Sequence, residues 1–355
     1  MIADTPWVLP AAGVACGTIM GAVARHNHFC TLSSLERYWY ANDDQGLRTW
    51  ALAGTVAMLL TQLLIQLNLI DAQQSFYLVP RLSLLGSIVG GLLFGIGMAL
   101  VGTCGFGALI RLGGGSLRSL IVVCTIGLAA LSTQRGPLGA LRQSFVEPYS
   151  LDLAPASDQS IPSLLSAATG YSIELPVILL CIAGLLFWVF RSKKFRSNTS
   201  SIFTGTVIGC CVAFGWFITH WLGENLFQTV QFESASFVLP PGQLVSSLTM
   251  ITGSLPDYGV GLVVGVVLGA ALAARWDNDV RWEACDDARE LSRHLMGACL
   301  MGIGGVLAAG CTIGQGISAV SMMAVSAPLV LISIYLGARI GLTWLLEGTI
   351  LPFSR

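Results

Sequence analysis

Two glycine-rich apolar stretches, 95–107 and 302–316, each place a cysteine beside threonine and glycine. The first contains Thr103 and Cys104, and the second contains Cys311 and Thr312. Small residues let helices approach closely, and a glycine-rich break frees backbone groups that lipid cannot satisfy. Such a break is tolerated where it lines a cavity or is buried in protein. A short helix that restarts after either cysteine would turn its N-terminal amides toward the break and favour an anion there.

The two stretches also match one another in register. Superposing Cys104 on Cys311 aligns four pairs of glycines at one constant offset, and a weaker copy places Gly21 nine residues before Cys30. Repeats of this kind are typical of secondary transporters, whose substrate site lies near the bilayer midplane where the repeats meet. We therefore predict that Cys104 and Cys311 lie close together there. The alternative is that the glycines serve only helix packing and the cysteines only fill space. The aligned pairs are Gly90 with Gly297, Gly95 with Gly302, Gly97 with Gly304 and Gly107 with Gly314.

Other polar residues carry two interpretations each. Arg111, just past the Cys104 stretch, would attract an anion at the inner mouth or serve as an ordinary basic loop residue. Thr103, Thr312 and Gln315 would line a pathway or bond between helices. Arg339, inside the last apolar run, would reach toward the inner interface or take part in the pathway. His26 and His28 with Cys30 resemble a soft-metal site only weakly, because no carboxylate follows at ligand spacing, and we expect neither a metal nor a cofactor.

The elements that position these residues are membrane helices. The chain of 355 residues is 54% hydrophobic and 10% charged, whereas a soluble domain carries about a quarter charged residues. The formal net charge of −1 and the lack of any block of like charge speak against a nucleic-acid partner. No nucleotide-binding P-loop and no CxxC pair is present in the sequence, so ATP use and a structural zinc site have no support.

Nine apolar runs long enough to span a bilayer predict an all-α, polytopic membrane protein. Fourteen Lys and Arg residues fall in the loops or tail on one side and three on the other, which predicts a periplasmic N-terminus and a cytoplasmic C-terminus in a bacterial inner membrane. Met1 to Pro6 carries no Lys or Arg, so the first run is expected to be retained. We expect one membrane domain over 1–355, with repeat halves at roughly 1–190 and 200–355. The runs are 7–24, 49–70, 82–102, 116–132, 174–190, 202–222, 258–274, 293–310 and 326–346.

The stretch Gly21 to Cys30, the Cys104 stretch continuing to Gly115, and the Cys311 stretch resemble the three signature segments of the YeeE/YedE family. The resemblance runs nearly end to end. It implies a compact fold of pseudo-symmetric repeats with short broken helices at the centre, and thiosulfate uptake along a path past Cys30, Cys104 and Cys311. A small cytoplasmic sulfur-carrier protein of the TusA type is the partner that it implies. The chain departs from the family in reading Gly-Thr-Cys at 102–104 and His-Asn-His-Phe-Cys at 26–30, which leaves the exact sulfur anion open.

Thiosulfate is a dianion with a soft terminal sulfur, and a neutral thiol in apolar surroundings donates weakly to that sulfur. The favoured hypothesis is therefore a transporter of thiosulfate or a related sulfur anion, without covalent chemistry. The first alternative is a membrane-embedded thiol redox enzyme that uses Cys104 and Cys311 as a pair, and the second is a soft-metal carrier. We expect the remaining cysteines to tolerate replacement by Ala or Ser: Cys16, Cys124, Cys181, Cys210, Cys211, Cys285 and Cys299.

Overall fold

The computed structural model describes residues 7–153, 158–171, 173–225, 230–249, 257–284 and 287–348. The described chain is almost entirely helical, which confirms the all-α prediction. The N-terminal residues 1–6, Cys285 and Arg355, on which some predictions rest, lie outside the described residues.

The α-helices are α1 (Val8–His26), α2 (Thr31–Ala41), α3 (Gln45–Gln66), α4 (Leu84–Val101), α5 (Gly105–Gly113), α6 (Leu117–Gln134), α7 (Pro137–Phe145), α8 (Ile161–Thr169), α9 (Glu174–Phe190), α10 (Lys193–Arg196), α11 (Thr199–Asn225), α12 (Pro240–Thr249), α13 (Tyr258–Trp276), α14 (Ala288–Leu307) and α15 (Ser326–Glu347). Short 3₁₀ turns are η1 (Ala72–Gln74), η2 (Phe76–Leu78) and η3 (Glu147–Tyr149), and η4 (Gly314–Ala319) is a π-helix. Strand β1 (Arg81–Ser83) pairs antiparallel with β2 (Ser150–Asp152), with Leu82 opposite Leu151.

Seven helical stretches of the described chain are long and apolar enough to cross a membrane, so this is a multi-pass membrane protein. The predicted count of nine is not confirmed. The other two predicted runs do form helices, but α9 has only 17 residues and α14 begins with Arg289, Glu290 and Arg293 in its first turns. The seven stretches are Val8–Ala41, Gln45–Gln66, Leu84–Gly113, Leu117–Gln134, Thr199–Asn225, Tyr258–Trp276 and Ser326–Leu346.

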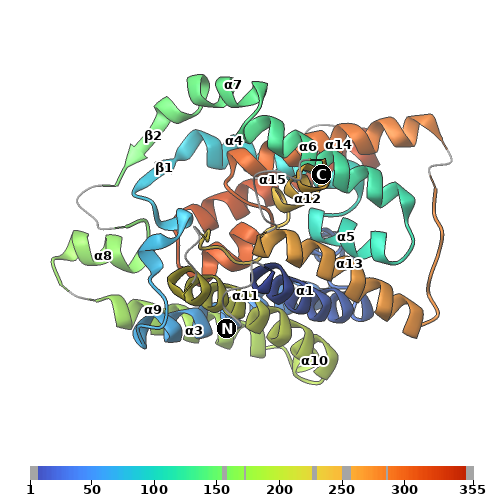
Figure 1. Ribbon diagram of the computed structural model, residues 1–355. Coiled ribbons are helices and arrows are strands. Elements are labelled where there is room, and N and C mark those ends of the chain that lie inside the picture. Colours follow the sequence, from blue (N-terminus) through green and yellow to red (C-terminus); the bar gives the residue numbers. More distant parts are fainter. Residues whose placement is uncertain are drawn as a thin grey trace.

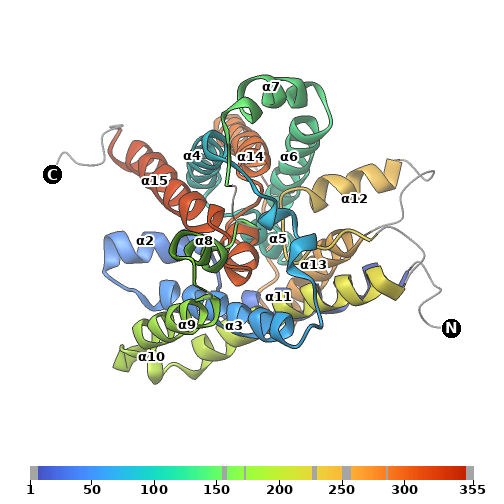
Figure 2. The same cartoon turned by 90° about the vertical axis from the view of Figure 1, so that its left-hand side faces the viewer.

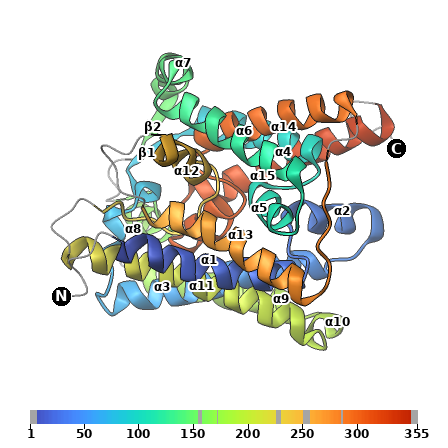
Figure 3. The ribbon, with the colours of Figure 1, turned by 45° about the vertical axis from the view of Figure 1, so that its right-hand side comes forward.

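The long helices form two groups that face one another across the centre of the molecule (Figures 1, 2 and 3). One group contains α1, α3, α9, α11 and α13, and the other contains α4, α6, α14 and α15. Short α5 lies between them and contacts α13 and α6, while η4 contacts α15, α3 and α11. The short broken segments that follow Cys104 and Cys311 are therefore placed between the two helix groups rather than on the lipid face.

Glycines set the spacing of the closest helix pair, α1 with α13. Gly17 in α1 has neighbours one turn away on each side, Gly13 and Gly21, and an added Cβ at Gly17 would lie 2.3 Å from the Leu262 carbonyl oxygen. From the opposite side, a Cβ at Gly265 would lie 2.3 Å from the Val14 carbonyl oxygen. Small residues at this spacing let helix backbones touch inside a membrane.

We expect Gly17→Ala to lower the thermal stability of the purified protein. The new methyl group would push backbone against backbone, an overpacking cost of about 1–3 kcal/mol that exceeds the roughly 1 kcal/mol of helix propensity gained. Gly184→Ala in α9 is the matched control, because nothing lies within 4 Å of a Cβ there. The measurement is a melting curve in detergent by fluorescence-detected size exclusion. Equal melting temperatures for the two variants would contradict the packing argument.

The pair α4 and α14 makes reciprocal glycine contacts. A Cβ at Gly90 would lie 2.7 Å from the Gly304 carbonyl oxygen, and one at Gly304 would lie 2.6 Å from the Gly90 carbonyl oxygen. Gly97 and Gly297 oppose one another in the same way, at 2.5 and 2.8 Å. On the outer sides of this pair, α15 packs on α4 and α6 packs on α14.

Candidate functional site

Cys104 caps the short helix that restarts after the first break. The preceding helix α4 ends at Val101 and is capped by Gly102, whose φ of +75° is in the left-handed region that favours glycine. Cys104 then occupies the N-cap of α5, and its Sγ accepts a hydrogen bond from the Gly107 amide at 3.4 Å. The thiol is fully buried.

Cys311 accepts the same kind of hydrogen bond at the second break, although Ile313 and not Cys311 is the N-cap of η4. Helix α14 ends at Leu307, and Ala309 and Gly310 both have positive φ before the chain turns into η4. The Cys311 Sγ accepts a hydrogen bond from the Gly314 amide at 3.2 Å. This thiol is also buried, so both sulfurs point into the protein and not toward lipid.

Phe237 brings the two cysteine loops together. It belongs to the non-helical segment 230–239 between α11 and α12, and its carbonyl oxygen lies 3.1 Å from an added Cβ at Gly105. Its backbone also faces the Cys311 thiol, and its ring packs against Phe106 with centroids 4.8 Å apart. The residues that follow Cys104 and the thiol of Cys311, far apart in sequence, thus both lie next to Phe237.

Cys30 joins the site through Thr103 and Gly107. It is the N-cap of α2, and its Sγ lies 3.8 Å from Thr103 Oγ1. A Cβ at Gly107 would lie 2.2 Å from Thr103 Oγ1, 3.4 Å from Cys30 Sγ and 3.6 Å from Cys104 Sγ. The two thiols and the hydroxyl therefore lie around Gly107, which has no side chain.

Beside Cys30 there is a small pocket of about 140 Å³, which is also lined by Thr103, Gly107 and Arg111. The Arg111 guanidinium donates to the Gly102 carbonyl oxygen at 3.0 Å, so it is held at the end of α4. Arg25, also in the wall, is paired with Asp279 at 2.9 Å. The structure thus places Arg111 at the mouth of a pocket that reaches Cys30 and Thr103.

Tyr77 and Ser236 lie at the other side of the Cys311 loop, and the sequence offered no signal for either. A Cβ at Gly314 would lie 3.1 Å from the Tyr77 hydroxyl and 3.3 Å from Ser236 Oγ. Both residues come from connecting segments that carry no motif. Their position beside Cys311 depends on how η2 and segment 230–239 fold back into the helix groups.

Comparison with known proteins identifies the family of this chain. The sequence matches the family described as Sulphur transport across residues 26–340. The chain belongs to this family. The resemblance to the YeeE/YedE proteins drawn from the cysteine stretches is thereby confirmed.

Two curated relatives share nearly their whole length with this member of the sulphur transport family. The thiosulfate transporter TsuA of Spirochaeta thermophila is 25% identical over 329 residues, covering 92% of this chain and 96% of the relative. The thiosulfate transporter TsuA of Escherichia coli K12 is 23% identical over 322 residues, covering 88% of each chain.

Two of the predicted polar lining residues of this sulphur transport protein have different surroundings. Gln315 is buried, and its Nε2 donates to the Ala308 carbonyl oxygen at 2.8 Å and the Ala309 carbonyl oxygen at 3.3 Å, so it satisfies the carbonyl groups freed at the end of α14. Thr312 is equally buried, but its hydroxyl has no partner within the described part of the chain. Thr312 therefore keeps a free hydroxyl beside Cys311.

Arg339 and His26 have partners outside the thiol cluster. The Arg339 guanidinium lies over the rings of Trp39 and Tyr40, 5.2 and 5.6 Å from their centroids. His26 Nδ1 pairs with the Asp277 carboxylate at 3.0 Å. Across the described residues, no three His, Cys, Asp or Glu side chains lie close enough to hold a metal ion together.

Glu233 is a buried carboxyl group that sequence reasoning missed. It lies in segment 230–239, outside the membrane-spanning helices, and its Oε1 accepts a hydrogen bond from the Gly259 amide at 3.0 Å. Burial raises the pKa of Glu233 to about 8, and the nearby Asp257 carboxylate adds to this effect. Glu233 therefore binds a proton more tightly in the folded protein than in an unfolded chain, where glutamate titrates near about 4.3.

We expect the purified protein to lose stability as the pH rises from the unfolded pKa of about 4.3 to the folded pKa of about 8. A raised pKa in the folded state stabilises the protein fully below the unfolded pKa, and this contribution disappears once the buried group ionises. The Glu233→Gln side chain keeps an oxygen that accepts the Gly259 hydrogen bond, but it cannot ionise. The melting temperature of this variant should therefore fall less than that of the wild type between pH 5 and pH 9. An equal fall in the melting temperatures of the wild type and Glu233→Gln over this pH range would contradict the raised pKa of Glu233.

Proposed function

We propose that this protein takes up thiosulfate or a related small sulfur anion across the bacterial inner membrane, past Cys311, Cys104 and Cys30. The observation that carries the proposal is that the thiols of Cys104 and Cys311 are both buried at breaks between helices, where each accepts a hydrogen bond from the amide three residues further on. Phe237 lies next to both breaks. Membership of the sulphur transport family and the named function of both relatives support the same substrate.

The site suits a dianion with a soft sulfur atom. Moving a bare charge out of water is prohibitive unless hydrogen-bond donors replace the lost hydration. Backbone amides at the start of α5 supply positive polarity, and neutral thiols are weak donors to sulfur. Weak donors favour passage, because a site that binds too tightly does not release its ion.

The neighbours of each thiol suggest an order of contacts along the path. Tyr77 and Ser236 lie beside Gly314 in the Cys311 loop, and Phe237 lies next to both the Cys311 thiol and Gly105. Cys104 is next to Thr103 and Cys30, and Cys30 opens into the pocket that contains Arg111. In this order the anion enters on the Tyr77 side and leaves on the Arg111 side, where a fixed guanidinium attracts it from the last thiol.

We also propose that the single membrane domain, with halves at roughly 1–190 and 200–355, is built from pseudo-symmetric repeats. The sequence alignment pairs Gly90 with Gly297 and Gly97 with Gly304. In the structure Gly90 contacts Gly304 while Gly97 contacts Gly297. This exchange of partners is what a two-fold axis between α4 and α14 produces.

The orientation is proposed from the loop charges, with the N-terminus periplasmic and the C-terminus cytoplasmic. The Arg111 pocket is then on the cytoplasmic side. We expect a C-terminal alkaline phosphatase fusion to be inactive and a C-terminal fluorescent-protein fusion to be bright, since the first enzyme folds only in the periplasm. The opposite result for both fusions would invert the proposed direction of transport.

The two alternatives have less support. A redox pair requires an accessible, activated thiol with a resolving partner, whereas Cys104 and Cys311 are both buried. A soft-metal carrier requires a ligand cluster, and the described residues contain none. A TusA-type sulfur carrier on the cytoplasmic side is the partner we propose.

The decisive experiment is uptake of ³⁵S-labelled thiosulfate into proteoliposomes that contain the purified chain, with free thiols counted before and after. We expect uptake above that of empty liposomes and an unchanged thiol count. Loss of two thiols for each anion consumed, without accumulation of label, would favour the redox enzyme. Saturable uptake of Cu⁺ in place of thiosulfate would favour the metal carrier.

A further inference from the structure

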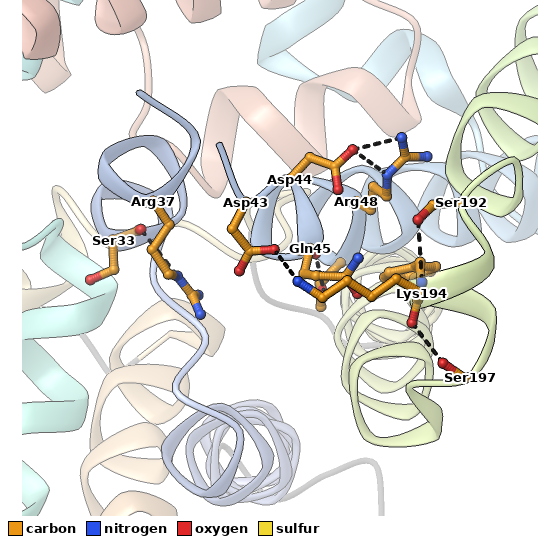
Figure 4. A network of polar contacts seen from close by, with 11 residues as sticks. Ser33, Arg37, Asp43, Asp44, Gln45, Arg48, Ser192, Lys194 and Ser197 are labelled. Carbon is orange, nitrogen blue, oxygen red and sulfur yellow. Dashed lines mark hydrogen bonds and ion pairs between the residues drawn. The ribbon is translucent and has the colours of Figure 1, made fainter. Parts of the chain in front are cut away.

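A second, larger pocket of about 650 Å³ adjoins the Arg111 pocket and shares His28 and Phe29 with it. Its wall is formed by the end of α1, by α2, by the start of α3 and by the chain from α10 into α11. The lining is almost entirely polar. Figure 4 shows part of this wall, with Arg37 on α2 and Lys194 on α10 on either side of Asp43 and Gln45 at the start of α3.

The start of α3 is open toward this pocket. Asp44, at the N-cap, makes no side-chain capping bond, because its carboxylate pairs with Arg48 at 2.7 Å. A Cβ at Gly46 would lie 2.4 Å from Ser34 Oγ and 3.1 Å from Arg37 Nη2. The absence of a side chain at Gly46 therefore lets a guanidinium approach the first turn of a long helix, where free amides carry partial positive charge.

Gln45 gives a second and independent indication of a ligand. Its side chain lines the pocket and is 7% exposed, yet neither its Nε2 nor its Oε1 has a hydrogen-bond partner in the described chain. Buried amide groups are nearly always paired. An unpaired carboxamide in the wall of a polar pocket indicates that a bound group supplies the missing contact.

The charges of the wall leave a positive excess. Asp43 is paired with Lys194 at 3.1 Å, and His26 is paired with Asp277. Arg37 donates only to the Ser33 carbonyl oxygen, at 3.4 Å, and no carboxylate in the described residues pairs with it. The uncompensated charge is therefore the guanidinium that lies at the first turn of α3.

We propose that this pocket is a second anion site, which binds a small tetrahedral dianion through Arg37, Gln45 and the first-turn amides of α3. The inference rests on the proposed function, because the anion would reach the pocket after leaving Cys30. Ser34 links the two places, since its hydroxyl donates to the Cys30 carbonyl oxygen at 2.7 Å. These donors recognise oxygen atoms and not sulfur, so the pocket binds sulfate as well as thiosulfate, unlike the thiol path.

The test is isothermal titration of the full-length protein in detergent with sodium sulfate and, separately, sodium thiosulfate. We expect sulfate to bind the wild type, and Arg37→Gln and Gln45→Leu each to weaken its affinity about tenfold or more, which is the loss of one charged or buried hydrogen bond. Cys311→Ala should bind sulfate like the wild type. Arg191→Gln, at an exposed arginine near the same face, controls for general surface charge.

Melting curves show whether each variant is folded before its binding is compared. Absence of sulfate binding in the wild type, or equal affinities in Gln45→Leu, Arg37→Gln and Arg191→Gln, would overturn the second site. Loss of sulfate binding in Cys311→Ala would place the anion at the thiols instead and overturn it too. Gln45-dependent sulfate binding in a protein that takes up no thiosulfate would support the pocket while refuting the proposed transport.

Discussion

Cys311→Ala is expected to reduce thiosulfate uptake by about a hundredfold or more while the protein stays folded, which corresponds to about 2.7 kcal/mol on the barrier to passage. Alanine removes the thiol that accepts a hydrogen bond from the Gly314 amide and faces the Phe237 backbone. The anion would then pass between Tyr77 and Cys104 without a thiol donor to its terminal sulfur. Cys311→Ser should also be impaired, because a hydroxyl has similar size but interacts less favourably with a soft sulfur.

The measurement for both Cys311 variants is growth on thiosulfate as the sole sulfur source in a strain without its own uptake systems, together with membrane expression and proteoliposome rates. Cys299→Ser is the matched control. Cys299 is on α14, the helix that precedes the Cys311 loop, but its side chain is exposed. If Cys311 only filled space, its loss would cost stability but not uptake per folded molecule. Wild-type growth by both Cys311 variants at equal expression would refute the cysteine pathway.

Gly107→Ala is expected to block uptake to a similar degree from a different position. The new methyl group would lie 2.2 Å from Thr103 Oγ1 and within 3.6 Å of the thiols of Cys30 and Cys104. It therefore occupies the space between the last two thiols of the proposed path without altering either sulfur. Gly184→Ala, where a Cβ meets nothing within 4 Å, should transport normally.

A double variant separates the steric effect from general damage to α5. Thr103→Ala removes the atom closest to the added methyl group, so Thr103→Ala/Gly107→Ala should regain thermal stability relative to Gly107→Ala, a coupling that a double-mutant cycle measures. Uptake should stay low in the double variant, because the methyl group still lies between the thiols. Uptake by Gly107→Ala at the wild-type rate would show that the anion does not pass this position.

Much of the architecture follows from the sequence because hydrophobicity and local breaks are local properties. The apolar runs predict helices, and all nine runs coincide with helices in the structure. The predicted count of nine spans is not confirmed. Because α14 begins with charged residues and α9 is short, seven helical stretches of the described chain are long and apolar enough to cross a membrane. The glycines around Cys104 and Cys311 predict where the helices break, because few other residues accept that backbone geometry.

The tertiary structure decided which polar groups share the site. Gln315 and Thr312 are both polar residues beside Cys311 in the sequence, but their surroundings differ. The Gln315 amide donates to the carbonyl groups at the end of α14, whereas the Thr312 hydroxyl has no partner among the described residues. Phe237 and Tyr77 belong to connecting segments without periodicity or motif, and they reach Cys311 only because the two helix groups leave a space that these segments fill. Such contacts depend on packing between distant parts of the chain, and hydropathy and residue spacing describe only neighbours in sequence.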